Sequence, residues 1–203
     1  MSISVLAGLG NPGGEYEGTR HNVGFRLIDA LAARESLAWS TDRHANALTA
    51  RWNRSPGLPG ILLVKPHSYV NESGFALRRI LDFQKLPVSS LAVIYDDLTL
   101  DVARLKVTVS GSAGGHNGVQ SLLDHLENGF VRFRIGIGPR KPPQIDLKDF
   151  VLGKFPAEDR SLIDAQISKY LSGLDLLVSE GVAAAMNQLN RKTNPNESDQ
   201  EKL

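Results

Sequence analysis

The chain has 203 residues, 41% of them hydrophobic, which is enough for one domain with a full core. It contains no cysteine, and this excludes a disulfide framework, a thiolate zinc site and a cysteine nucleophile. The formal net charge of +1 argues against a protein that coats nucleic acid non-specifically, and no apolar run reaches the roughly 18 residues of a membrane span. Residues 1–8 also lack the features of a signal peptide, so we expect a cytoplasmic protein without membrane contact.

Segments typical of strands and of helices alternate along the chain. In chain order, strands are expected at residues 3–7, 45–52, 61–64, 91–95, 104–109 and 131–137, and helices at 23–33, 75–83, 119–126 and 162–189. The last helix is expected to break near Gly181, and prolines and glycines between residues 56 and 60 indicate a turn. This order predicts an α/β fold, a single-domain three-layer sandwich with a mixed central sheet flanked by helices, over residues 1–190. Residues 191–203 are polar, lack apolar periodicity, and are expected to be a disordered C-terminal tail.

Gly8, Gly10 and Gly13 form the pattern G-x-G-x-x-G after a predicted strand, which is the fingerprint of dinucleotide-binding domains. That fingerprint requires a helix that begins inside the motif, whereas Pro12 and further glycines keep this chain in turns until residue 21. It also requires an acidic residue at the end of a second strand, and none stands there. The glycines instead indicate a tight loop in which the backbone approaches a ligand or another strand.

Five polar residues fall in Gly-rich segments or at the ends of predicted elements. They are Asn11, His21, Asn71, Asp96 and Asn117. In α/β sheets, ligands bind beyond the carboxyl ends of the strands, and His21, Asn71 and Asp96 each follow a predicted strand. We therefore expect these three near one edge of the sheet.

His21 is the candidate general base, because its side chain titrates near neutral pH. Asp96 can accept the imidazole N–H, which fixes the tautomer and stabilises the imidazolium. Asp97 is the competing partner, and both aspartates could simply close the strand. A single histidine before a helix is also often a surface or capping residue. The other four histidines show no spacing typical of a zinc site.

An asparagine amide offers both a donor and an acceptor, so three asparagines could hold a peptide backbone without reading its side chains. Each also has a purely structural alternative. Asn71 could cap a helix, with Val70 and Phe75 as a hydrophobic staple. Asn117 could cap the next helix, and Asn11 could be only a turn residue.

The chain offers no common route to a covalent intermediate. No serine lies in a G-x-S-x-G nucleophile elbow, and cysteine is absent. The candidate residues can instead activate a water molecule. The sequence therefore predicts a hydrolase that uses a base-activated water, for which an ester is an easier substrate than an unactivated amide.

Residues 130–154 carry six basic residues against two acidic ones. The chain as a whole is close to neutral, so any phosphate-binding site here is a local one. The alternative is an ordinary solvated rim around a strand and a loop.

Seven short motifs follow one another in order along the chain. They are GLGNPG at 8–13, TRHNVG at 19–24 preceded by Tyr16, KPHSYVNESG at 65–74, YDDL at 95–98, GSAGGHNG at 111–118, RIGIG at 134–138 and FVL at 150–152. Together they resemble the bacterial peptidyl-tRNA hydrolase family, over residues 3 to 156. Seven ordered motifs are far more specific than any one of them.

The resemblance implies a monomeric α/β enzyme without metal or other cofactor, which takes peptidyl-tRNA and cleaves the ester between the peptide and the 3′ end of the tRNA. It implies that His21 is the base and Asp96 its orienting partner. The residues that it implies for binding the substrate or the attacking water are Asn11, Tyr16, Asn71 and Asn117. Lys106 and Arg134 would bind tRNA phosphate, and segment 111–118 would form a mobile rim of the cleft.

The chain departs from the family pattern in three places, one of them at Thr99 and Asp101, which interrupt the run that usually follows the strand. Val70 stands where methionine is usual, and Thr108 stands where many members have a second basic residue, which puts tRNA affinity in question. An alternative is an inactive RNA-binding relative of the same fold, which the complete catalytic set disfavours. A nucleotide-binding oxidoreductase is disfavoured further, because the dinucleotide motif fails.

Overall fold

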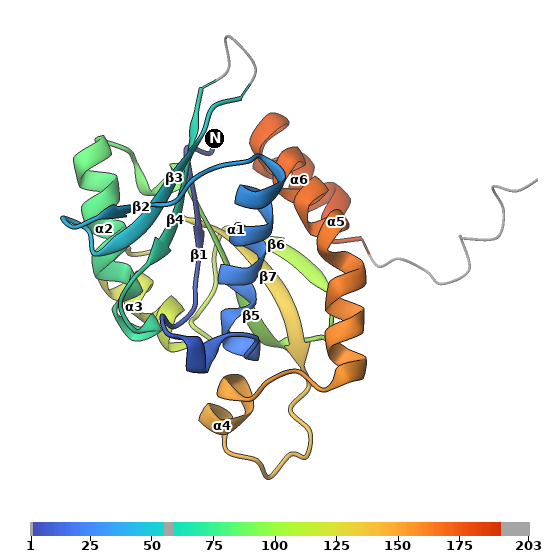
Figure 1. The fold of residues 1–203 in the computed structure, drawn as a ribbon. Coiled ribbons are helices and arrows are strands. Elements are labelled where there is room, and N and C mark those ends of the chain that lie inside the picture. The colour runs from blue at the N-terminus through green and yellow to red at the C-terminus, as the bar shows by residue number, and fades with distance from the viewer. Residues whose placement is uncertain (1, 55–58, 192–203) are drawn as a thin grey trace, which may run out of the picture.

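The computed structural model describes residues 2–54 and 59–191. Its centre is a seven-stranded mixed sheet with the strand order β2-β3-β4-β1-β5-β7-β6 (Figure 1). The strands are β1 (Val5–Gly8), β2 (Ser40–Asp42), β3 (Ala47–Trp52), β4 (Ile61–Pro66), β5 (Leu91–Asp101), β6 (Leu105–Thr108) and β7 (Val131–Gly138). The four central strands β4, β1, β5 and β7 are parallel, and the strands outside them are antiparallel to their neighbours.

Helices cover both faces of the sheet, so the predicted three-layer α/β sandwich is confirmed (Figure 1). The α-helices are α1 (Val23–Arg34), α2 (Ser73–Gln84), α3 (Asn117–Leu126), α4 (Leu147–Leu152), α5 (Ala157–Ser179) and α6 (Val182–Leu189). Four single-turn 3₁₀ helices join them, namely η1 (Gly14–Tyr16), η2 (Arg20–Asn22), η3 (Val70–Glu72) and η4 (Val88–Ser90). Within the described residues, no helix is long and apolar enough to cross a membrane.

The side-chain alternation of the central strands divides the core between the two faces. On β1, Leu6 belongs to the cluster under α1 and α5, whereas Val5 and Ala7 belong to the cluster under α2 and α3. Both faces of β1 are buried, which explains its uninterrupted apolar run.

The outer pair β6 and β7 is apolar on one face only. Phe133 of β7 packs in the cluster under α5, but its neighbours Arg132 and Arg134 point to the opposite face. Lys106 of β6 lies directly opposite Arg134 in the ladder, so it projects on the same face. This face of the sheet is therefore basic where the other strands are apolar.

The structure corrects one local expectation and adds two elements. β5 continues to Asp101, with a register irregularity between Asp97 and Asp101, so Asp96 lies inside a strand instead of ending it. β2 and α4 were not expected, since neither has an apolar pattern long enough to detect. The expected break in the last helix is confirmed at Gly181, whose φ is 88°. Part of the predicted turn at residues 56–60 and all but the first residue of the predicted tail at 191–203 lie outside the described residues.

Candidate active site

A cavity of about 800 Å³ lies at the edge of the sheet where the parallel strands end. Seven of the eight predicted site residues line it, namely Asn11, Tyr16, His21, Asn71, Asp96, Asn117 and Arg134. They come from segments that are far apart in the sequence and adjacent in the sheet, as expected for a doubly wound fold. Lys106 does not line the cavity but lies beside Arg134 on the neighbouring strand.

Two glycines bring the turn that carries His21 close to β5. Gly24, in the first turn of α1, lies so near the carbonyl oxygen of Ile94 that a Cβ at this position would collide with it. A Cβ on Gly8 of β1 would in turn lie 2.5 Å from the carbonyl oxygen of Gly24. The start of α1 therefore packs directly on the backbone of β1 and β5, and η2 places His21 within reach of Asp96.

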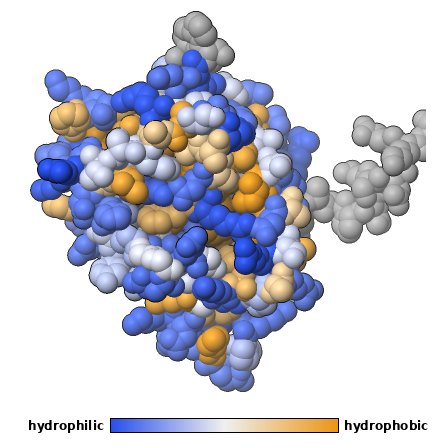
Figure 2. Space-filling model, in the orientation of Figure 1, coloured by the Kyte–Doolittle hydropathy of each residue, from blue (hydrophilic) through white to orange (hydrophobic). Residues whose placement is uncertain are grey.

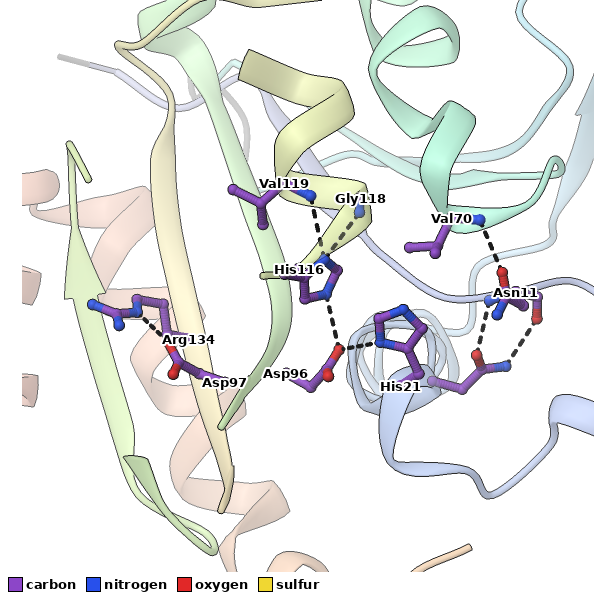
Figure 3. A network of polar contacts seen from close by, with 10 residues as sticks. Asn11, His21, Val70, Asp96, Asp97, His116, Gly118, Val119 and Arg134 are labelled. Atoms are coloured by element: carbon purple, nitrogen blue, oxygen red, sulfur yellow. Dashed lines mark hydrogen bonds and ion pairs between the residues drawn. The ribbon is translucent and has the colours of Figure 1, made fainter. Parts of the chain in front are cut away.

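His21 and Asp96 form a buried hydrogen-bonded pair (Figure 3). Nδ1 of His21 lies 2.9 Å from Oδ1 of Asp96, and the two residues are only 6% and 3% exposed. Because the carboxylate accepts the proton on Nδ1, the lone pair of neutral His21 is on Nε2. Nε2 makes no hydrogen bond to any other residue of the described chain, so it is available to a ligand in the cavity.

Burial and charge act in opposite directions on the pKa values of this pair. Burial alone lowers the pKa of His21, but the charge and the hydrogen bond of Asp96 outweigh it, so this pKa is raised above its usual value. Burial likewise raises the pKa of Asp96, but His21 and His116 overcome it and bring this pKa well below its usual range. Asp96 is therefore ionised wherever His21 titrates.

His116 is a member of the site that the sequence interpretation missed. Its Nε2 lies 3.0 Å from the same Oδ1 of Asp96 that bonds His21 (Figure 3). Its Nδ1 accepts the backbone N–H groups of Gly118 and Val119, at 3.1 and 3.2 Å, and so carries no proton. His116 is thus a neutral donor to Asp96 and the N-cap of α3 at once. Its position inside the Gly-rich motif, one residue before Asn117, was the available signal.

Asp96 and Asp97 were both candidates for the partner of His21, and their side chains point in different directions. Asp97 points away from His21, and its Oδ2 accepts a hydrogen bond from Nε of Arg134 at 2.5 Å (Figure 3). Its Oδ1 accepts from the backbone and the hydroxyl of Thr99. Asp96 alone therefore contacts the candidate base, and Asp97 orients a cation.

Asn11 was considered as a simple turn residue, but both its side chain and its backbone are fixed by hydrogen bonds to other segments. Its Oδ1 accepts the backbone N–H of Val70 at 2.8 Å, which fixes the orientation of the amide and leaves both Nδ2 donors for a ligand. The side chain of Asn22 accepts the backbone N–H of Asn11 at 2.8 Å and donates to the carbonyl of Asn11 at 2.9 Å. Asn22 is a second residue that the sequence interpretation did not single out.

The capping roles considered for Asn71 and Asn117 are not observed. Asn71 lies inside η3, and the residue that precedes α2 is Glu72, without a side-chain cap. Asn117 is the first residue of α3, and His116 occupies the capping position. Both asparagines line the cavity, and neither side chain is hydrogen-bonded within the described part of the protein. Their amides are therefore open to a ligand.

Aromatic and basic side chains extend the cavity on opposite sides of His21. Tyr16 and Tyr69 meet edge to face, with ring centroids 6.4 Å apart. On the other side, Arg132 and Arg134 line the cavity, and the Arg132 guanidinium donates to the carbonyls of Gly111 and Ser112. The Gly-rich rim is thus attached to β7 through an arginine.

Arg132, Arg134 and Lys106 form a basic row on β7 and β6, and Thr108 lies next to it. It lies opposite Arg132 in the ladder, two residues from Lys106, and so occupies the position where a fourth cation would extend the row. Its hydroxyl is buried and makes no hydrogen bond among the described residues.

His21, Asp96 and His116 also form a group whose ligand atoms lie within 4.8 Å of one another. The ring nitrogens that face Asp96 are already hydrogen-bonded to it, and the other nitrogen of His116 accepts two backbone N–H groups. A cation would have to displace these hydrogen bonds. The arrangement fits proton transfer better than metal ligation.

Known proteins are similar to this chain in fold and in sequence. The family model described as peptidyl-tRNA hydrolase matches residues 5–197. The peptidyl-tRNA hydrolase of Lachnospira eligens is 40% identical over 92% of this chain and 98% of its own, and that of Thermoanaerobacter pseudethanolicus is 43% identical over the same shares. The crystal structure of peptidyl-tRNA hydrolase from Acinetobacter baumannii superimposes with a TM-score of 0.86 at 34% identity, covering 93% of this chain and 94% of that one. The chain belongs to the peptidyl-tRNA hydrolase family.

Proposed function

We propose that the protein hydrolyses the ester that joins a peptide to the 3′ end of tRNA. The observation that carries this proposal is the buried His21–Asp96 pair, whose free Nε2 faces a cavity with open amides and a basic wall. Membership of the peptidyl-tRNA hydrolase family gives the class of substrate. We further propose that it acts as a monomer in the cytoplasm, where translation produces peptidyl-tRNA.

In this mechanism, Nε2 of His21 removes a proton from a water molecule while the water oxygen attacks the ester carbonyl carbon. Asp96 remains ionised and stabilises the imidazolium that forms, without taking up a proton itself. When the intermediate collapses, the bond from the carbonyl carbon to the 3′ oxygen breaks. The imidazolium then returns its proton to the 3′ oxygen, and the products are a free peptide acid and tRNA.

The asparagine amides bind the groups on either side of the reacting carbon. Nδ2 of Asn11 is fixed as a donor, because its Oδ1 is used by Val70, and it can stabilise the negative oxygen of the intermediate. The open amides of Asn71 and Asn117 bind the peptide backbone or the attacking water. Tyr16 contributes an aromatic wall beside the peptide.

Lys106 and Arg134 bind phosphate of the tRNA. The resemblance implied this role for the pair, and it is supported by their positions side by side on the same face of β6 and β7. Phosphate contacts of this kind position a nucleic acid and supply affinity that depends on salt.

The direct test is hydrolysis of N-acetyl-aminoacyl-tRNA by the purified protein. The unmodified protein is expected to release free tRNA, and His21→Ala is expected to lose nearly all turnover while it still binds tRNA. Full turnover by this variant would contradict the mechanism. Binding of tRNA without hydrolysis by the unmodified protein would instead favour the inactive RNA-binding relative.

The asparagines also make a prediction about selectivity. If they read a backbone amide, a substrate with a blocked amino group will be hydrolysed faster than free aminoacyl-tRNA. Equal rates on the two substrates would show that the asparagines do not provide this selectivity.

A further inference from the structure

A second cavity, of about 850 Å³, adjoins the proposed active site. Asn11 lines both cavities, and residues 11–22 and 65–71 supply walls to each. Residues 11–22 contribute Tyr16 and His21 to the first cavity and Gly14 and Gly18 to the second. The two spaces therefore share a border.

The order of the strands in the sheet determines the order in which the site residues lie along the cleft. Arg134 lies on β7, Asp96 on β5, and Asn11 follows β1, and Figure 3 shows Arg134 and Asn11 on opposite sides of His21. The strands next in line are β4 and β3, and these contribute Lys65 and Leu48 to the second cavity. A substrate whose phosphates lie on β6 and β7 and whose ester lies at His21 would next extend over the ends of β4 and β3.

We propose that the second cavity binds the part of the peptide that lies upstream of the residue attached to the tRNA. This inference rests on the proposed function and names the place where the longer substrate is held. Extended peptide advances about 3.3–3.6 Å per residue, so a chain that leaves His21 towards Asn11 passes to the neighbouring strands within a few residues.

The wall of the second cavity fits a peptide of varied sequence. Gly14 and Gly18 expose open backbone, since no atom lies within 4 Å of a Cβ built on either residue. Phe25 and Leu48 supply apolar surface, and Lys65 is held across the rings of Phe25 and Trp39. The face that carries α1 mixes small hydrophobic and hydrophilic areas and shows no single large patch of either kind (Figure 2).

The charge of the wall of the second cavity is mixed. Two of the cations in the wall are paired within the protein, Lys65 with Asp29 at 2.6 Å and Arg26 with Asp164. Glu17 adds a further negative charge to the wall. Lys154 and Arg160 also line this cavity, so its wall carries charges of both signs, and the order of the strands, not the charge, favours the peptide as the occupant.

The experiment compares substrates of two lengths on the same tRNA, N-acetyl-aminoacyl-tRNA and a hexapeptidyl-tRNA that ends in the same residue. Gly14→Phe fills the cavity from one wall, and Leu48→Trp fills it from the other. Gly14→Ala is the matched control, because it changes the same backbone position without filling the space. None of these residues belongs to the proposed catalytic or tRNA-binding set.

Both filling variants are expected to lower kcat/KM for the hexapeptidyl substrate by about tenfold, with kcat/KM for the short substrate unchanged. Gly14→Ala is expected to match the unmodified protein on both. Equal losses on the two substrates would overturn the inference, because they indicate an RNA contact or a folding defect. Full activity of both variants on the long substrate would also overturn it. Failure of the unmodified protein on the short substrate would refute the proposed function instead, and the two failures are distinguishable.

Discussion

The centre of the cleft and its basic side hold their polar groups in different ways. At the centre, His21 and Asp96 are buried, and the imidazoles of His21 and His116 are each fixed by a hydrogen bond to the carboxylate of Asp96. On the basic side, Arg134 and Lys106 are partly exposed and project from an open face of β6 and β7. Chemistry at one carbon atom depends on geometry that is set before the substrate arrives, whereas phosphate binding depends mainly on the number of nearby charges.

Removing the base is expected to have the largest effect. His21→Ala should lower kcat by about 10²–10⁴-fold, because this is the usual contribution of general base catalysis. The measurement is single-turnover hydrolysis of N-acetyl-aminoacyl-tRNA, with tRNA affinity measured in parallel. An equal loss of tRNA affinity would show that the residue binds and does not catalyse.

Asp96→Asn should lower kcat less, by about 10–100-fold, because a wrongly oriented imidazole still accepts a proton part of the time. It should also change the pH profile. The base acts in its neutral form, so activity is lost as pH falls through the pKa of His21, which Asp96 raises. Without the carboxylate, burial dominates and this pKa falls.

The acidic limb of kcat/KM is therefore expected to move to lower pH in Asp96→Asn, and to lie above the ordinary histidine pKa in the unmodified protein. A pH series on both proteins checks this. A limb that stays in place, or moves to higher pH, would show that Asp96 does not set the pKa of the base.

Arg134→Ala tests the other side of the cleft. We expect KM for the tRNA substrate to rise by about tenfold with little change in kcat, and the salt dependence of binding to weaken by about one phosphate contact. Arg51→Ala, an exposed arginine on β3, is the matched control. A fall in kcat without a change in KM would place Arg134 in the chemistry.

His116→Ala should have the smallest effect on turnover, a few-fold, since His21 keeps its own bond to Asp96. It also removes the N-cap of α3, which costs about 1 kcal/mol of unfolding free energy. Urea unfolding and kcat measured together separate the two effects. His125→Ala, at the other end of the same helix, is the control.

Sequence pattern predicted the elements that depend on apolar periodicity. The central strands and α1, α2 and α3 were located because their side chains must alternate between core and surface with a fixed period. β2 was missed because its three residues, Ser40–Asp42, are all polar and pair through the backbone. α4 has only six residues, too few to show a period.

Most residues of the site could be predicted from the sequence, but the hydrogen bonds that connect them could not. The rule that ligands bind where parallel strands end brought His21, Asn71 and Asp96 to one edge. The contact of His116 with Asp96 spans 20 residues and depends on the path of the Gly-rich segment, which no periodicity records. Asn22 was missed for a similar reason, because its side chain bonds to backbone atoms and leaves no pattern of residue types.

The glycine in the first turn of α1 has a consequence for how variants of this protein are interpreted. Gly24 sets how near the helix lies to the backbone of β5, and therefore the spacing between imidazole and carboxylate. A side chain at this position would push the helix outward and pull the two catalytic groups apart, although both would still stand unchanged in the sequence. A homologue that keeps every reactive residue but replaces this glycine could not be assumed to be an enzyme.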